Sequence, residues 1–186
     1  MKVIETGFSG LYIIEPVVFK DKRGYFFESY NMGQLKENKL NFTSLQDNES
    51  YSSGNVIRGL HYQLNPMAQA KLIRVVKGHI RDVVLDMRKG SPTYGKWKAV
   101  DLDSESKYQL FIPGGFAHGF SVLSKEAIIL YKCDNYYSPD HERGVAFDDP
   151  ALDIDWGIDP ESTVVSEKDR NNPPLSEADN NFEYIP

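Results

Sequence analysis

The stretch Val56-Ile-Arg-Gly-Leu-His-Tyr-Gln63 joins an apolar strand opening to an arginine and a histidine three positions apart. An arginine can bind a phosphate through two parallel charge-assisted hydrogen bonds, and a histidine transfers protons near neutral pH because its unperturbed pKa is ~6.5. Side chains alternate between the two faces of a strand, so Arg58 and His61 should point in opposite directions. Both can face one cavity if the register slips between them, and we expect such a bulge at Gly59. The alternative is an exposed arginine beside a histidine buried in the core.

The composition favours one globular domain and restricts the possible partners. We assign all 186 residues, 1–186, to a single domain, and hydrophobic residues make up 40% of it. The net charge of -6 argues against nucleic acid, so the counter-charges for an anionic ligand must be local. The single cysteine, Cys133, excludes an intramolecular disulfide and fits a reducing compartment. The N-terminal segment has no uninterrupted apolar run, so we expect no secretion signal, no membrane association and a cytoplasmic location.

Short strand-like segments follow one another with turns about every 8 to 12 residues. In the first half we expect strands at 11–19, 25–30 and 42–48, a turn at 21–24, a helix at 31–40 and a loop at 49–55. After the opening stretch we expect strands at 71–77, 80–87, 97–102, 108–112, 119–123 and 127–134. From Pro139 onward the pattern becomes irregular and rich in proline and acidic residues. This rhythm predicts an all-β fold, an antiparallel jelly roll (a cupin-like sandwich or barrel) with a few short peripheral helices.

A second motif, Phe111-Ile-Pro-Gly-Gly-Phe-Ala-His118-Gly-Phe120, resembles the second signature of the cupins, which are small β jelly rolls. In metal-binding cupins the first signature supplies two histidines separated by one residue, and then a glutamate. Here the corresponding stretch is His61-Tyr62-Gln63, and no glutamate follows in 64–68. Two histidines are fewer than the three ligands of a catalytic metal site, so we expect no metal and no cofactor. The alternative is a metal-dependent cupin oxygenase, which predicts a metal in the purified protein.

Taken together, motifs along nearly the whole chain resemble the dTDP-4-dehydrorhamnose 3,5-epimerase family. They are Arg23-Gly-Tyr-Phe-Phe-Glu28, Gln46-Asp-Asn48, Arg58-Gly-Leu-His-Tyr-Gln63, Lys71, Phe111 to Phe120, Tyr131-Lys-Cys-Asp-Asn-Tyr-Tyr137 and Ser166-Glu-Lys-Asp169. The family's members are cofactor-independent homodimeric jelly rolls. The resemblance implies an isomerase that inverts C3 and C5 of dTDP-4-keto-6-deoxyglucose to give dTDP-4-keto-L-rhamnose, in dTDP-L-rhamnose biosynthesis.

The resemblance also implies the catalytic residues. The C4 ketone acidifies the hydrogens at C3 and C5, so each inversion needs a base on one face and an acid on the other. His61 is expected to be the base, and Asp169 the carboxylate that orients it. Tyr131 is expected to be the opposite-face acid, because a phenol with a pKa of ~10 is protonated at rest. Lys71 is expected to contact the substrate and stabilise the enolate at O4.

Other matched positions are expected to bind the substrate. Arg23 and Arg58 can neutralise the diphosphate with bidentate hydrogen bonds, and the amides of Gln46 and Asn48 suit the edge of a pyrimidine. By resemblance, Phe26 is expected to stack on the thymine and Glu28 to accept a hydrogen bond from thymine N3. The resemblance adds Glu142 and Lys168 as two further ligand contacts.

His118 is expected to contribute another donor near O4. Asp82, an acid in the middle of an otherwise apolar strand, is the candidate to hold His118 in place. The family further implies that the aromatic N-terminal strand reaches into the neighbouring subunit. We therefore expect a homodimer, with pairing between subunits through the region Leu11 to Tyr30.

Two other functions remain open. The set of His61, Tyr131 and Asp169 would also serve an epimerase that inverts only C3 or only C5 of a related dTDP-4-keto-6-deoxy sugar. A non-catalytic sugar-nucleotide binding module becomes the better interpretation if His61 and Tyr131 do not face one cavity.

Overall fold

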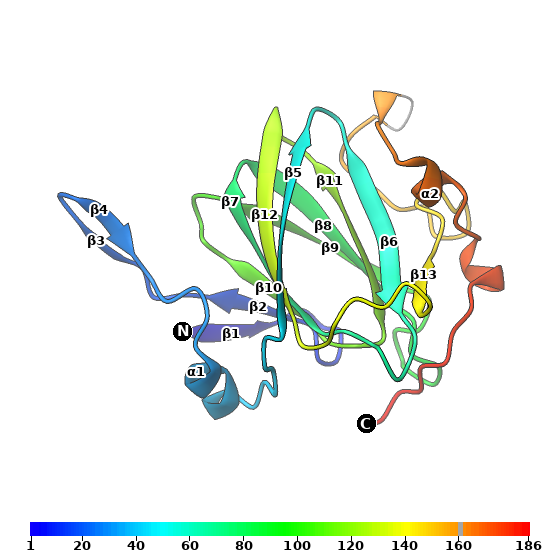
Figure 1. The fold of residues 1–186 in the computed structure, drawn as a ribbon, viewed down its shortest axis with the longest axis horizontal. Coiled ribbons are helices and arrows are strands. Elements are labelled where there is room, and N and C mark those ends of the chain that lie inside the picture. Colours follow the sequence, from blue (N-terminus) through cyan, green and yellow to red (C-terminus); the bar gives the residue numbers. More distant parts are fainter. Residues whose placement is uncertain (160–161) are drawn as a thin grey trace.

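In the computed structural model, which describes residues 1–159 and 162–186, two antiparallel sheets pack against each other (Figure 1). Within these residues, a six-stranded sheet has the order β1-β2-β10-β7-β12-β5 and a five-stranded sheet the order β13-β6-β11-β8-β9. The six strands are β1 Lys2–Glu5, β2 Tyr12–Glu15, β10 Gln109–Ile112, β7 Lys71–Lys77, β12 Glu126–Cys133 and β5 Gln46–Ser53. The five are β13 Glu142–Gly144, β6 Ile57–Gln63, β11 Phe116–Val122, β8 His79–Asp86 and β9 Trp97–Asp103. The predicted antiparallel all-β fold is confirmed.

Apolar residues fill the space between the sheets and also cover the outer face of the smaller sheet. Ile73 of β7 and Val84 of β8 are fully buried in one cluster between the sheets. Val83, the preceding residue of β8, points to the other face and packs with Trp156 and Phe182 of the C-terminal part. Because successive residues of a strand point to opposite faces, cover on both sides of the sheet leaves β8 buried without interruption from Asp82 to Asp86.

The helices are short and peripheral, as predicted. Those that lie wholly within the described residues are α1 Met32–Glu37, α2 Glu167–Arg170 and the 3₁₀ helix η2 Leu175–Glu177. Asn31 caps α1, because its side chain accepts a hydrogen bond from the backbone of Gln34. None of the helices in the described part of the chain is long and apolar enough to span a membrane.

Several of the predicted boundaries are wrong. The segment 49–55, predicted to be a loop, is largely strand, since β5 runs from Gln46 to Ser53 and 42–45 lies outside it. The polar residues of β5 carry no hydrophobic signal, but they pair with β12 in unbroken register from Gln46 opposite Cys133 to Ser53 opposite Glu126. The predicted strand 25–30 ends at Phe26, and the predicted strand 11–19 is interrupted after Glu15, next to Pro16.

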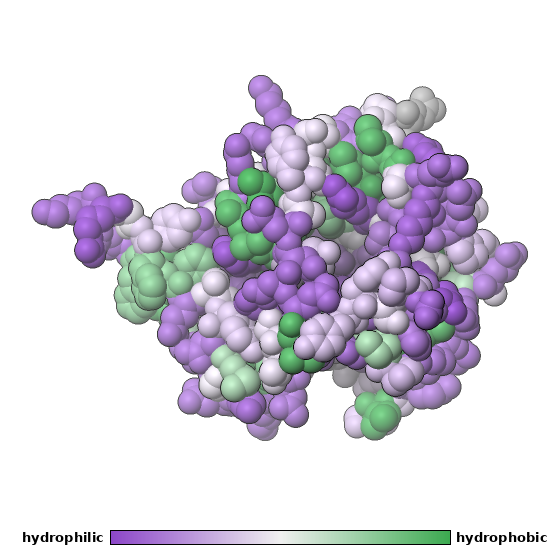
Figure 2. Space-filling model, in the orientation of Figure 1, coloured by the Kyte–Doolittle hydropathy of each residue, from purple (hydrophilic) through white to green (hydrophobic). Residues whose placement is uncertain are grey.

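The N-terminal hairpin stands away from the sandwich (Figure 1). It consists of β3 Phe19–Asp21 and β4 Gly24–Phe26, which pair only with each other. Phe19 and Phe26 are 62% and 66% exposed in the single chain. Figure 2 shows the hydrophilic tip of this projection with apolar side chains beside it. A small two-stranded ribbon of this kind is at best marginally stable by itself.

Candidate active site

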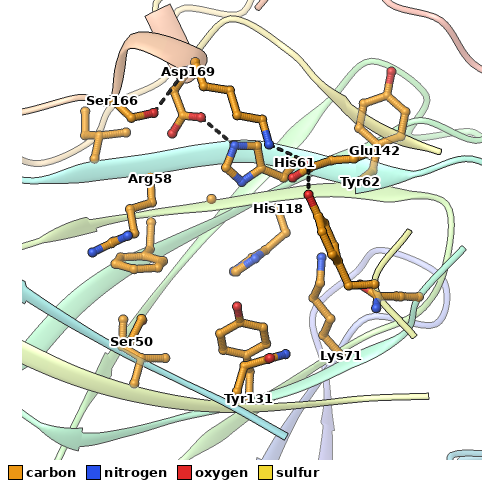
Figure 3. Close-up of a pocket in the computed structure, with 18 of the residues that line it drawn as sticks. Ser50, Arg58, His61, Tyr62, Lys71, His118, Tyr131, Glu142, Ser166 and Asp169 are labelled. Carbon is orange, nitrogen blue, oxygen red and sulfur yellow. Dashed lines mark hydrogen bonds and ion pairs between the residues drawn. The ribbon is translucent and has the colours of Figure 1, made fainter. Parts of the chain in front are cut away.

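A cavity of about 670 Å³ opens between the two sheets, and most of the predicted site residues line it (Figure 3). One wall belongs to β5, β7 and β12, and the opposite wall to β6, β11 and β13, while α2 closes one side. The predicted residues on these walls are Gln46, Asn48, Arg58, His61, Lys71, His118, Tyr131, Glu142, Lys168 and Asp169. The fold thus gathers residues separated by more than a hundred positions in the sequence.

A bulge in β6 brings Arg58 and His61 to the same cavity. His61 lies opposite His118 of β11 and Arg58 lies opposite Phe120, so three steps along β6 match two along β11. Gly59 sits within this bulge at φ +104°, and a Cβ there would lie 2.6 Å from the backbone oxygen of His118. Only glycine tolerates both the conformation and the contact. The predicted bulge at Gly59 is confirmed.

His61 and Asp169 form a hydrogen-bonded dyad. Nε2 of His61 lies 2.6 Å from Oδ1 of Asp169, and Oδ2 accepts a hydrogen bond of 3.0 Å from the backbone N–H of Gly59. Ser166 caps the short helix α2 by accepting from the backbone N–H of Asp169, which fixes the position of the carboxylate. Burial opposes ionisation of the Asp169 carboxyl, but the hydrogen bonds from His61 and Gly59 outweigh it and hold its pKa below the usual range.

The ionised carboxylate determines which nitrogen of His61 is basic. A carboxylate only accepts hydrogen bonds, so neutral His61 must carry its proton on Nε2, where Asp169 accepts it. Nδ1 then keeps its lone pair and is the atom able to take a proton from a substrate.

A second histidine on the same wall is held in the same way. Nε2 of His118 lies 2.8 Å from Oδ2 of Asp82, whose side chain is fully buried. The predicted contact between Asp82 and His118 is therefore present, and it fixes the ring that borders the cavity.

The opposite wall carries Tyr131 and Lys71, whose polar ends point across the cavity toward the histidines (Figure 3). Burial raises the pKa of the Tyr131 phenol, which keeps its proton in place. Burial lowers the pKa of the Lys71 amine. Within residues 1–159 and 162–186, no hydrogen bond or ion pair occupies the Lys71 amine, so it is free to donate to a ligand.

Arg58 is clamped through one side of its guanidinium. Nε donates to the buried Ser52 hydroxyl at 2.9 Å, and Nη2 donates to the backbone oxygen of Tyr51 at 2.9 Å. These two bonds hold an exposed side chain against the rim of the cavity, where the remaining N–H groups can bind an anion. At the other end of β5, Gln46 donates to the Asn48 side chain at 3.0 Å, so the two predicted amides orient one another.

A residue without a predicted role, Tyr137, completes the mouth of the cavity. Its phenol donates to Oε2 of Glu142 at 2.6 Å, and Lys168 forms an ion pair with the same oxygen at 2.5 Å. Burial opposes ionisation of Glu142, but the bonds from Lys168 and Tyr137 prevail and lower its pKa. Tyr137 and the helix cap Ser166 both lie in the quoted motifs. The spacing Ser166-x-x-Asp169 is a capping pattern that would have indicated the cap.

Three predicted ligand contacts lie away from the cavity of this chain. Arg23, at the tip of the projecting hairpin, pairs with Asp21 at 2.6 Å, and Phe26 is exposed to solvent. Glu28 accepts hydrogen bonds from Asn31 and Gln34. Their roles stay predictions that require a second subunit.

No group of three or more His, Cys, Asp or Glu side chains in the described part of the chain is arranged to hold a metal ion. Gln63, which stands where metal-binding cupins have a ligand histidine, is buried and bonded to backbone groups of two neighbouring loops.

Comparison with known proteins gives a consistent result. The model of the family described as dTDP-4-dehydrorhamnose 3,5-epimerase matches residues 5–177. The dTDP-4-dehydrorhamnose 3,5-epimerase of Methanothermobacter thermautotrophicus is 48% identical over 177 residues, which cover 95% of each chain. That of Shigella flexneri is 48% identical over 182 residues, covering 96% of this chain and 98% of the relative. A crystal structure of dTDP-6-deoxy-D-glucose-3,5-epimerase from Legionella pneumophila in complex with dTDP-4-keto-L-rhamnose aligns with a TM-score of 0.93 at 42% identity. That alignment covers 100% of this chain and 99% of the other.

Proposed function

The chain belongs to the dTDP-4-dehydrorhamnose 3,5-epimerase family and is an isomerase, and we propose that it inverts C3 and C5 of dTDP-4-keto-6-deoxyglucose to give dTDP-4-keto-L-rhamnose. One observation carries the proposal: the His61–Asp169 dyad and the protonated phenol of Tyr131 approach a single cavity from opposite walls. Inversion of a carbon requires this arrangement, because the proton must leave one face and return to the other. A purely binding module has no need of it.

The walls of the cavity supply each part of a proton-transfer mechanism. Nδ1 of His61 removes the proton from a carbon next to the C4 ketone, and the electron pair of the C–H bond moves into the enolate with charge on O4. The ammonium of Lys71 and the ring of His118 stabilise that charge. Tyr131 then delivers its proton to the opposite face, which inverts the carbon. Asp169 stabilises the imidazolium while His61 holds the proton.

The remaining residues of the cavity suit the nucleotide. Arg58 has guanidinium N–H groups directed to the rim, and a diphosphate offers the oxygen pairs that a planar guanidinium binds through two hydrogen bonds. Gln46 and Asn48 present amide groups for a pyrimidine. The Legionella relative holds dTDP-4-keto-L-rhamnose, so a dTDP-sugar is the ligand we assign to this chain.

Incubation with dTDP-4-keto-6-deoxyglucose in D2O tests the proposal. Deuterium at both C3 and C5 is the expected result, with dTDP-glucose as the control, because it lacks the ketone and should not exchange. Deuterium at only one carbon would instead identify a single-carbon epimerase. The absence of exchange at either carbon would overturn the proposal.

The alkaline side of the pH profile should report Lys71. Burial lowers the pKa of its amine from 10.5, whereas burial raises the pKa of the Tyr131 phenol from 10.0. Burial therefore moves loss of the ammonium proton to lower pH and loss of the phenol proton to higher pH, and we expect the alkaline fall of kcat/KM to follow the Lys71 pKa. Lys71→Met should be less active and should lack this decline. An identical alkaline decline in both enzymes would show that another group causes it.

We further propose that the projecting hairpin completes the site of a second subunit. Arg23 and Phe26 lie outside the cavity of their own chain, yet their residue types suit a diphosphate and a thymine ring. We expect a dimer in analytical sedimentation at micromolar concentration. A double variant Arg23→Ala/Phe26→Ala and the variant His61→Ala should each be nearly inactive alone. Mixed together they should regain activity, because hybrid dimers contain one site with an intact hairpin and an intact His61. If mixing restores nothing, the hairpin does not act across subunits.

A further inference from the structure

The loop 135–138, between β12 and β13, forms part of the rim of the cavity. Its Tyr137 lines the cavity and donates to Glu142, while Tyr136 and Tyr137 remain largely exposed. Backbone groups of the loop bond to side-chain amides instead of a neighbouring strand. The Tyr137 N–H donates to Gln46 at 2.9 Å, and the Asn135 oxygen accepts from Gln69 at 2.8 Å.

Gln63 makes the largest contribution to this arrangement. Its Nε2 donates to the backbone oxygens of Met67 at 2.6 Å and Tyr136 at 3.1 Å, and its Oε1 accepts from the Ser138 N–H at 2.8 Å. The side chain is only 5% exposed. Both amide hydrogens and the amide oxygen are therefore used to join the end of β6 to two loops. The groups bonded to the amide, the Met67 and Tyr136 oxygens and the Ser138 N–H, are backbone groups that would otherwise lack a hydrogen-bond partner.

We propose that Gln63 is a positioning residue that holds the loop 135–138, and with it Tyr137, over the mouth of the cavity. A primary amide carries two donors and an acceptor on one flat group, whereas an imidazole offers only two nitrogens. A histidine at this position, as in metal-binding cupins, could not make all three bonds. The amide at position 63 thus serves the architecture of the rim.

The effect on the reaction should concern substrate binding more than proton transfer. The loop reaches the substrate side of the site through Tyr137, whose phenol is linked to Glu142 and Lys168. The His61–Asp169 dyad is fixed independently, by the Gly59 N–H and the Ser166 cap. Resting on the proposed function, the inference therefore predicts a raised KM with little change in kcat.

Gln63→Met removes all three hydrogen bonds while roughly preserving side-chain volume. We expect KM for dTDP-4-keto-6-deoxyglucose to rise about tenfold or more, because buried polar groups lose their partners. We expect kcat, and deuterium wash-in at saturating substrate, to stay within about threefold of the wild-type values. Hydrogen–deuterium exchange at the backbone of 136–138 should accelerate, as should chymotrypsin cleavage after the exposed Tyr136 and Tyr137.

Asn180→Leu is the matched control. The Asn180 amide likewise donates to a backbone oxygen, that of Met87, and accepts from the Phe182 N–H, but it organises the C-terminal segment away from the cavity. It should change KM and the exchange of 136–138 by less than twofold. Gln63→Glu is a second variant, which keeps the acceptor for the Ser138 N–H but places a carboxylate oxygen against the backbone oxygens of Met67 and Tyr136, and it should raise KM at least as much as Gln63→Met.

The inference is overturned if Gln63→Met and Gln63→Glu leave KM unchanged, or if the exchange of 136–138 is the same as in wild type. It is also overturned if kcat falls as much as kcat/KM, because Gln63 would then support the chemistry and not the rim. Exchange in the 136–138 backbone is measured without turnover. A failure of this inference is therefore distinct from a failure of wild-type wash-in, which tests the proposed function.

Discussion

Replacing His61 with alanine is expected to reduce epimerisation on the order of 10²-fold or more and to reduce deuterium wash-in at C3 and C5 equally. The reason is that Nδ1 of His61 takes the proton in the proposed mechanism, and without it the enolate forms far more slowly. Both rates can be followed by NMR in D2O. His79→Ala is the control, because this histidine is partly exposed and lies outside the cavity. A His61→Ala enzyme that still exchanges at the wild-type rate would remove His61 from the mechanism.

Asp169→Asn should weaken the same base without removing it. The two oxygens of Asp169 accept from His61 and from the Gly59 N–H, so an amide must place its NH2 group against one of these donors. If that group faces His61, the ring must carry its proton on Nδ1, and the lone pair no longer points into the cavity. We expect the rate to fall while the affinity for dTDP, measured by calorimetry, stays nearly unchanged. A large loss of dTDP affinity would indicate that Asp169 contributes to binding.

Tyr131→Phe is expected to separate proton exchange from inversion. The phenol supplies the proton on the face opposite His61, so its removal leaves enolate formation intact and slows reprotonation from that face. His61 can then return a proton to the face from which it came. Deuterium should enter the sugar while the inverted product forms on the order of 10²-fold more slowly, which mass spectrometry and NMR of one sample would both reveal.

The control for this variant is Tyr51→Phe, which removes a phenol on β5 that bonds to Glu126 outside the cavity. It should leave both rates unchanged. If Tyr131→Phe still binds substrate but loses exchange and inversion together, then the roles of Tyr131 and His61 are reversed, or another residue carries the proton.

The strands could be predicted where burial leaves a periodic trace in the sequence. The segment Lys71 to Lys77 was assigned to its observed bounds because apolar residues dominate it and Gly78 ends it. The segment 49–53 was missed because its residues are polar, and their strand conformation depends on the ladder with β12. A ladder is a property of two segments, so the local sequence of one of them does not reveal it.

The site, too, could be predicted only in the part that depends on local sequence. The residue types and the bulge at Gly59 follow from the local sequence, because a register slip is required for Arg58 and His61 to share a cavity. Asp169 follows only from the family resemblance, since it lies 108 positions from His61. Nothing in the residues between them indicates that α2 places its carboxylate 2.6 Å from Nε2.

By itself, the sequence determined the class of fold, most strand positions, and the chemical groups available for proton transfer and anion binding. Only the tertiary structure decided that Asp169 directs the lone pair of His61 into the cavity, that Tyr131 faces it from the other wall, and that Gln63 holds the rim. The physical reason is one of range. Strand periodicity and side-chain chemistry are set by neighbouring residues, whereas hydrogen bonds within the site depend on how distant strands and loops pack together.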